Sequence, residues 1–114
     1  MAFQFLRVRR RKIKNDARFV HWYQSAGSTP LQRPGNLDPA VTHETATIYM
    51  HQVLGNTQKE ELQIWIWKAM AGGTELGWHT VSLLEEERHP AAAHLVLSVN
   101  NKLQPTWVVP NTAR

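Results

Sequence analysis

The feature that most constrains the fold of this chain is a two-residue alternation of side-chain type that recurs between turn-forming residues. The alternation is clearest over residues 45–54 and 76–84. Because residues two apart lie on the same face of a strand, this periodicity favours half-buried strands. Further stretches with strand composition occur at residues 3–14, 18–24, 94–99 and 106–109. The sequence therefore predicts a mainly β fold, a small antiparallel β-sandwich or barrel of six or seven strands.

Two elements of this prediction are ambiguous. In residues 58–70, Thr57 and Glu60 form a helix capping box, and apolar residues follow at helical spacing. The same stretch also alternates, and four of the six residues 62–67 are Ile or Trp, which suit a sheet better. We therefore expect a strand there. The alanines at 91–93, preceded by Pro90, have the composition of one short helix.

The alternation also predicts which residues are inside and which segment is outside. Residues 28–39 contain three prolines and the turn pair Gly35-Asn36, so we expect an exposed, protease-sensitive loop there. The predicted core is formed mainly by Ile48, Ile64, Trp65, Trp78, Leu83, Val96 and Val99.

The residue types argue against most catalytic chemistry. The chain has no Cys, so thiol nucleophiles and thiolate metal sites are excluded. It contains no Gly-rich phosphate loop and no GxSxG motif, and its six His show no metal-ligand spacing. No window approaches 18 consecutive apolar residues, which excludes a membrane-spanning helix. We therefore expect a protein that is not an enzyme, without metal or cofactor.

Positive charge is concentrated at the start of the chain. Residues 1–18 hold seven Lys or Arg against one acidic residue, whereas residues 19–114 hold six against eight. Such a field attracts a polyanion or an anionic membrane surface. A solvated basic strand is the plainest alternative, and a cleaved presequence is disfavoured because this segment lacks Ser. The basic residues in question are Arg7, Arg9, Arg10, Arg11, Lys12, Lys14 and Arg18.

Large aromatic side chains are the second candidate for a binding surface. If residues 62–67 form a strand with Leu and Ile inward, Trp65 and Trp67 point outward side by side. Exposed paired rings form a stacking platform for bases. The competing interpretations are that the pair belongs to the core or to a protein interface.

Two hypotheses of function follow from these residues. The first is a single domain, residues 1–114, that binds RNA or single-stranded DNA, with the basic segment on phosphates and Trp65 and Trp67 on bases. The second is a structural or assembly subunit of a viral particle or other large complex, bound to a protein partner or to copies of itself. The hypotheses are separated by whether the basic side chains and the exposed rings share one face.

Overall fold

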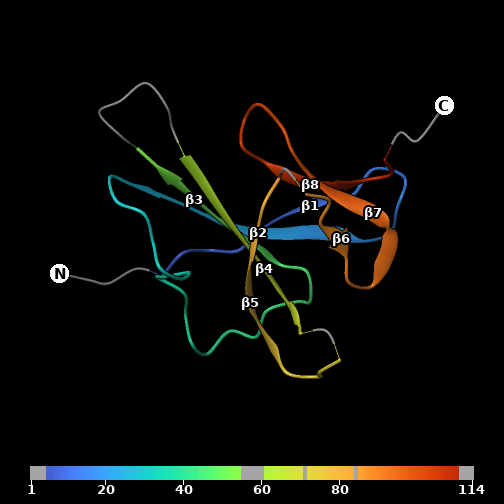
Figure 1. The fold of residues 1–114 in the computed structure, drawn as a ribbon, viewed down its shortest axis with the longest axis horizontal. Helices are drawn as coiled ribbons and strands as arrows, with labels where there is room; N and C mark the ends of the chain where they lie inside the picture. Colours follow the sequence, from blue (N-terminus) through green and yellow to red (C-terminus); the bar gives the residue numbers. More distant parts are fainter. Residues whose placement is uncertain (1–4, 55–60, 71, 84, 111–114) are drawn as a thin grey trace.

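The computed structural model describes residues 5–54, 61–70, 72–83 and 85–110, and its strands form two sheets (Figure 1). The larger sheet has the order β1-β2-β3-β4-β5 and the smaller has the order β6-β7-β8. The larger sheet consists of β1 (Arg9–Lys12), β2 (Phe19–Gly27), β3 (Ile48–Val53), β4 (Glu61–Ala69) and β5 (Leu76–Val81). The smaller consists of β6 (Arg88–His89), β7 (Ala92–Val99) and β8 (Pro105–Val108). The predicted mainly β fold is confirmed.

One strand pair departs from the antiparallel prediction. β2 and β3 are parallel, with Trp22 opposite Ile48 and Gly27 opposite Val53, whereas the other pairs are antiparallel. A parallel pair needs a long connection that returns to the starting end of the sheet, and residues 28–47 supply it. Alternation is the same in either direction of pairing, so the sequence pattern did not carry this information.

The ambiguous segment around residue 65 is a strand. β4 pairs with β3, placing Met50 opposite Ile64 and Ile48 opposite Ile66, so these four apolar side chains share one face. The part of the predicted element at residues 58–60 lies outside the described residues. The connection to β5 is a turn at Gly72, whose φ of 79° is one that glycine adopts without strain.

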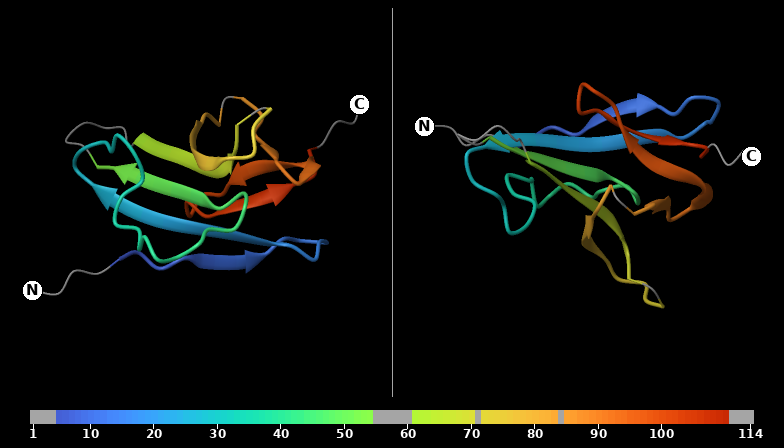
Figure 2. Two further views of the ribbon diagram at one scale, coloured as in Figure 1. Left: turned by 90° about the horizontal axis from the view of Figure 1, so that it is seen from below. Right: turned by 45° about the horizontal axis from the view of Figure 1, so that its top comes forward.

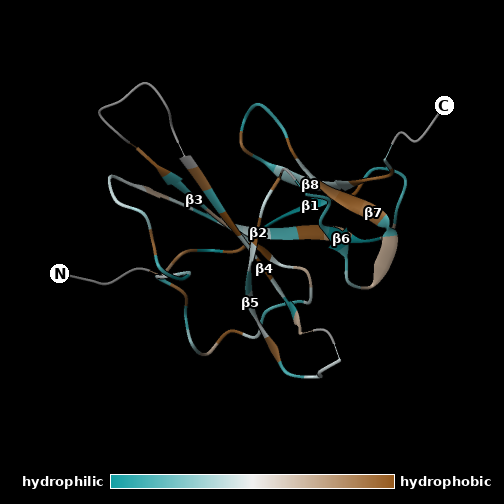
Figure 3. Ribbon diagram, in the orientation of Figure 1, coloured by the Kyte–Doolittle hydropathy of each residue, from teal (hydrophilic) through white to brown (hydrophobic). Residues whose placement is uncertain are grey.

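The main core lies between the two sheets. The smaller sheet contacts β2 through β8 and sits toward the start of β2, at one end of the larger sheet (Figures 1 and 2). It contributes Leu95, Leu97 and Trp107 to a cluster with Val20, Trp22 and the Ile residues of β3 and β4. β7 is accordingly hydrophobic in Figure 3, whereas β1 is hydrophilic.

The predicted core is confirmed in part. Ile48, Ile64 and Trp65 are buried. Trp78, Val96 and Val99 are only half-buried. The prediction that Leu83 belongs to the core is wrong, because its side chain is 50% exposed. β5 ends at Val81, so the alternation that suggested an inward Leu83 continues past the end of the strand.

The opposite face of the larger sheet is covered by residues 28–47, which cross it between β2 and β3 (Figure 2, left). Three side chains of the sheet hold this segment through its backbone. The Tyr49 hydroxyl donates to the Gly35 carbonyl at 2.8 Å and accepts from the Gly35 N–H at 3.2 Å. Gln63 bonds both the N–H and the carbonyl of Leu31, at 2.8 and 2.9 Å. His51 contacts the Thr29 carbonyl at 2.9 Å. Residues 28–39 are mostly exposed, as predicted, and these hydrogen bonds anchor them to the sheet.

Two further expectations are corrected. The residues expected as a short helix are not helical: Pro90 and Ala91 form the turn of the β6–β7 hairpin, and Ala92 and Ala93 begin β7. In the turn, the His89 Nδ1 accepts a hydrogen bond from the Ala91 N–H at 3.0 Å. The strand expected over residues 3–14 is reduced to β1, because the Leu6 N–H donates to Asn36 in the covering segment. Residues 3 and 4 lie outside the described residues.

Candidate functional site

The two tryptophans proposed as a stacking platform are not an exposed pair. Trp65 is 4% exposed and packs with Tyr49, whose ring centroid lies 5.7 Å away. Trp67 is half-buried, with the rings of His43 and Trp78 at 5.0 and 5.2 Å. The sheet face that carries both side chains is the one covered by residues 28–47. The core interpretation is therefore correct for Trp65, and the expectation of an exposed platform is wrong there.

The basic side chains of β1 lie on an edge strand and are all exposed. Because successive side chains of a strand point to opposite faces, they divide into two pairs. Arg9 and Arg11 share the face of Trp22 and Val20, which they oppose in the sheet. There they are engaged: Arg9 donates to the Gln24 side chain at 2.9 Å and Arg11 to that of Gln104 at 3.3 Å.

The other pair of basic residues lies beside one exposed and one half-buried ring. Arg10 is opposite His21 and Lys12 is opposite Phe19, so all four lie on one face of β1 and β2. Phe19 is 40% exposed, and the Arg10 guanidinium carbon lies 4.8 Å from the centre of its ring. This is a cation–π distance. We call Arg10, Lys12, Phe19 and His21 the basic track.

The remaining basic residues of the segment lie around the turn between β1 and β2 or ahead of it. Arg18 is paired with Asp16, its Nη1 3.1 Å from each carboxylate oxygen. The Arg18 N–H also donates to Asp16 at 2.8 Å, and this bond is the largest cause that lowers the pKa of the carboxyl. Lys14 is exposed in the same turn, and Arg7 is exposed ahead of β1. Of the seven predicted residues, the structure thus brings Arg10 and Lys12 together with the exposed ring of Phe19 and the half-buried ring of His21.

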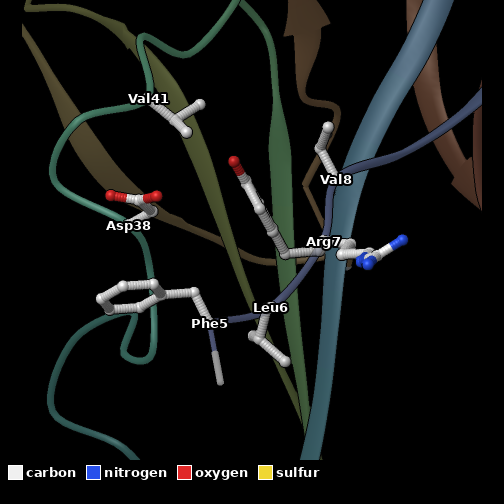
Figure 4. Close-up of a pocket in the computed structure, with 7 residues that line it drawn as sticks. Phe5, Leu6, Arg7, Val8, Asp38 and Val41 are labelled. Atoms are coloured by element: carbon white, nitrogen blue, oxygen red, sulfur yellow. The ribbon is translucent and has the colours of Figure 1, made fainter. Parts of the chain in front are cut away.

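A cavity of about 410 Å³ lies next to the track where the chain enters β1 (Figure 4). In Figure 4, Val8 and Val41 face each other across it, Phe5 lies near Asp38, and the Arg7 guanidinium points away. Tyr23 lines the same cavity, and its hydroxyl is 3.2 Å from the His43 Nδ1. Burial raises the pKa of this hydroxyl, and the Asp38 charge raises it further.

A second cavity, of about 310 Å³, lies at the other end of the track. Phe19 and His21 line it from β2, and Glu44 and Thr45 line it from the segment that covers the sheet. His89 and Ala91 of the β6–β7 hairpin and Arg18 also line it. Tyr23 in the first cavity and Phe19 in the second are four residues apart on β2, which is about 14 Å along a strand. The track therefore connects two hollows.

Two further features are absent from the part of the chain that the structure describes. It holds no group of three or more His, Asp or Glu placed to bind a metal ion. It also contains no helix of the length and hydropathy needed to span a membrane.

Sequence reasoning identified the basic residues but missed their aromatic and acidic neighbours. Phe19, His21, Asp38 and Glu44 belong to no motif, and their proximity depends on strand register and on the path of residues 28–47. The one available signal was Phe19 itself, an aromatic residue directly after Arg18 at the start of a predicted strand.

Comparisons with known proteins identify no relative of this chain. No model of a known protein family matches the sequence, and neither a curated protein nor a solved structure matches the chain.

Proposed function

We propose that the protein binds single-stranded nucleic acid along the basic track, without catalysis. The observation that carries the proposal is the register of β1 and β2, which sets Arg10 and Lys12 beside Phe19 and His21 on one exposed face. Cations at strand spacing offer contacts to successive phosphates, and an exposed ring offers a surface for an unpaired base. Trp65 and Trp67 have no part in this version of the hypothesis.

The arrangement favours a single strand over a duplex. An aromatic ring stacks on a base only when the base is unstacked from its neighbours, as in loops and single strands. The Arg10 guanidinium already lies over the Phe19 ring, and guanidinium planes stack on bases as aromatic rings do. The proposal therefore assigns one phosphate contact each to Lys12 and Arg10, and base stacking to the Arg10–Phe19 pair.

Two variants of equal charge test the proposal. Arg10→Ser/Lys12→Ser removes the cations of the track, and Arg9→Ser/Arg11→Ser removes the same charge from the other face of β1. Binding of a fluorescent octathymidylate is measured by anisotropy from 50 to 300 mM salt. We expect the first variant to bind more weakly and to flatten the log-affinity slope by about 1.4, or 0.7 for each lost contact. The second should keep the wild-type slope.

The role of the ring is tested separately. Phe19→Ala should weaken binding by about 1–3 kcal/mol with an unchanged salt slope, because base stacking releases no counterions. Phe19→Tyr retains a stacking ring and should bind as the wild type does. If the two double variants lose affinity equally, the track is not the binding face.

The alternative hypothesis, an assembly subunit that binds a protein partner, predicts a different result. In that case the octathymidylate binds neither the wild type nor the variants at physiological salt, whereas an acidic protein binds through β1. Self-association through β1 is disfavoured on electrostatic grounds, because edge pairing of two copies brings the RRRK segments against each other.

A further inference from the structure

The cavity at the Phe19 end of the track contains an acidic group close to the cations of β1. Glu44 lines it, and no described residue donates a hydrogen bond to or pairs with its carboxylate. Arg18 also lines the cavity, but its guanidinium is already bound to Asp16. A free carboxylate beside a phosphate-binding surface opposes binding by repulsion, unless it accepts hydrogen bonds from the ligand.

Donors for a ligand are present in the same cavity. His89 is 7% exposed, and burial is the largest cause that lowers its pKa, so the imidazole is neutral near pH 7. Its Nδ1 accepts from the Ala91 N–H, so the ring proton is on Nε2. His21 lines the cavity as well, half-buried and opposite Arg10. The lining thus combines a carboxylate acceptor, imidazole N–H donors and the ring of Phe19.

We propose that this cavity takes a guanine base of the bound strand, an inference that rests on the proposed nucleic-acid binding. Guanine offers adjacent N–H donors at N1 and N2 that match one carboxylate, and acceptors at O6 and N7 that match an imidazole N–H. Thymine and uracil place two carbonyl oxygens around a single N–H. Cytosine and adenine each offer one amino group as donor. Only guanine uses the carboxylate through two bonds, and the cavity volume of about 310 Å³ admits a purine.

The test uses octathymidylate and three versions with one central dG, dA or dC, bound to the wild type and to Glu44→Gln. We expect the dG oligonucleotide to bind the wild type about 5- to 100-fold more tightly than the all-dT one. Deoxyinosine, which lacks the N2 amino group, should recover only part of this gain. Glu44→Gln should abolish the preference while leaving the salt slope unchanged, and Glu75→Gln, at an exposed carboxylate beside β5, should preserve it.

Failure of this inference is distinguishable from failure of the proposed function. If the wild type binds all four oligonucleotides equally, the guanine assignment is overturned while binding along the track stands. If Glu44→Gln binds every oligonucleotide more tightly with the wild-type order of preference, the carboxylate only repels phosphate and the assignment is again overturned. If no oligonucleotide binds, both proposals fall.

Discussion

Replacing Tyr49 by Phe tests how the covering segment is held on the larger sheet. Tyr49 is 0% exposed, and its hydroxyl makes two hydrogen bonds to the backbone of Gly35, at 2.8 and 3.2 Å. Removing the hydroxyl leaves the N–H and carbonyl of Gly35 without these partners, while the ring and its packing remain. At about 1 kcal/mol for each bond, the free energy required to open the segment locally falls by about 2 kcal/mol. The open population then rises about 30-fold.

Limited thermolysis measures this opening. Leu37 belongs to the covering segment and is half-buried against the sheet, so it becomes accessible when residues 28–40 detach. When opening is fast relative to cleavage, the cleavage rate follows the open population. The initial rate of cleavage before Leu37, measured by mass spectrometry, should therefore rise about 30-fold in Tyr49→Phe.

Tyr23→Phe is the matched control for this prediction. It also removes one hydroxyl from a buried ring, but that hydroxyl contacts His43, eight residues beyond Gly35. Cleavage before Leu37 should stay within about threefold of the wild-type rate, equivalent to less than 1 kcal/mol. Equal cleavage rates in wild type and Tyr49→Phe would refute the assignment of the Gly35 bonds as the anchor.

Further predictions concern stability. Burial lowers the pKa of His43 and His89 below 6.5, so the unfolded chain binds more protons than the folded one as the pH falls through 6.5. The free energy of unfolding, from urea titrations, should therefore be steady above about pH 7.5 and decline from pH 7 to 5. Ile66→Ala, at a residue with 0% exposure, should cost about 2–5 kcal/mol in the same assay, whereas Leu83→Ala should change it by about 0.5 kcal/mol or less. Gly72→Ala places a side chain at a residue whose φ is 79° and should lower the free energy of unfolding by about 1 kcal/mol. The measurement is a decrease in the midpoint of thermal unfolding.

The fold was predictable from sequence wherever alternation was strong and local. The β-rich class, the hairpin at Gly72 and the strand over residues 61–69 follow from periodicity and turn residues, which act over a few neighbouring positions. The parallel pairing of β2 with β3 does not, because it depends on the path of a connection of about twenty residues. The burial of Leu83 was overestimated because a periodic sequence pattern does not mark the residue at which strand pairing stops.

Of the candidate site, only the positive charge was predictable from the sequence. The basic run predicts an exposed, positively charged segment at β1, but the division of its side chains between two faces requires the register with β2. The proposed ring partners were misplaced because the outward face of β4 is covered by a segment with few large apolar residues. That segment is held there by Tyr49, His51 and Gln63, and single hydrogen bonds of this kind leave no periodic pattern in the sequence.

The central claim, that single-stranded nucleic acid binds along the basic track, is tested most directly by a ¹H–¹⁵N NMR titration with octathymidylate at low salt. The account predicts that the largest shift changes occur at the amides of Arg10, Lys12, Phe19 and His21. Amides of β5, at the opposite edge of the larger sheet, should not shift. Shift changes that cluster on β5 or on the smaller sheet, with the amides of β1 and β2 unchanged, would contradict it.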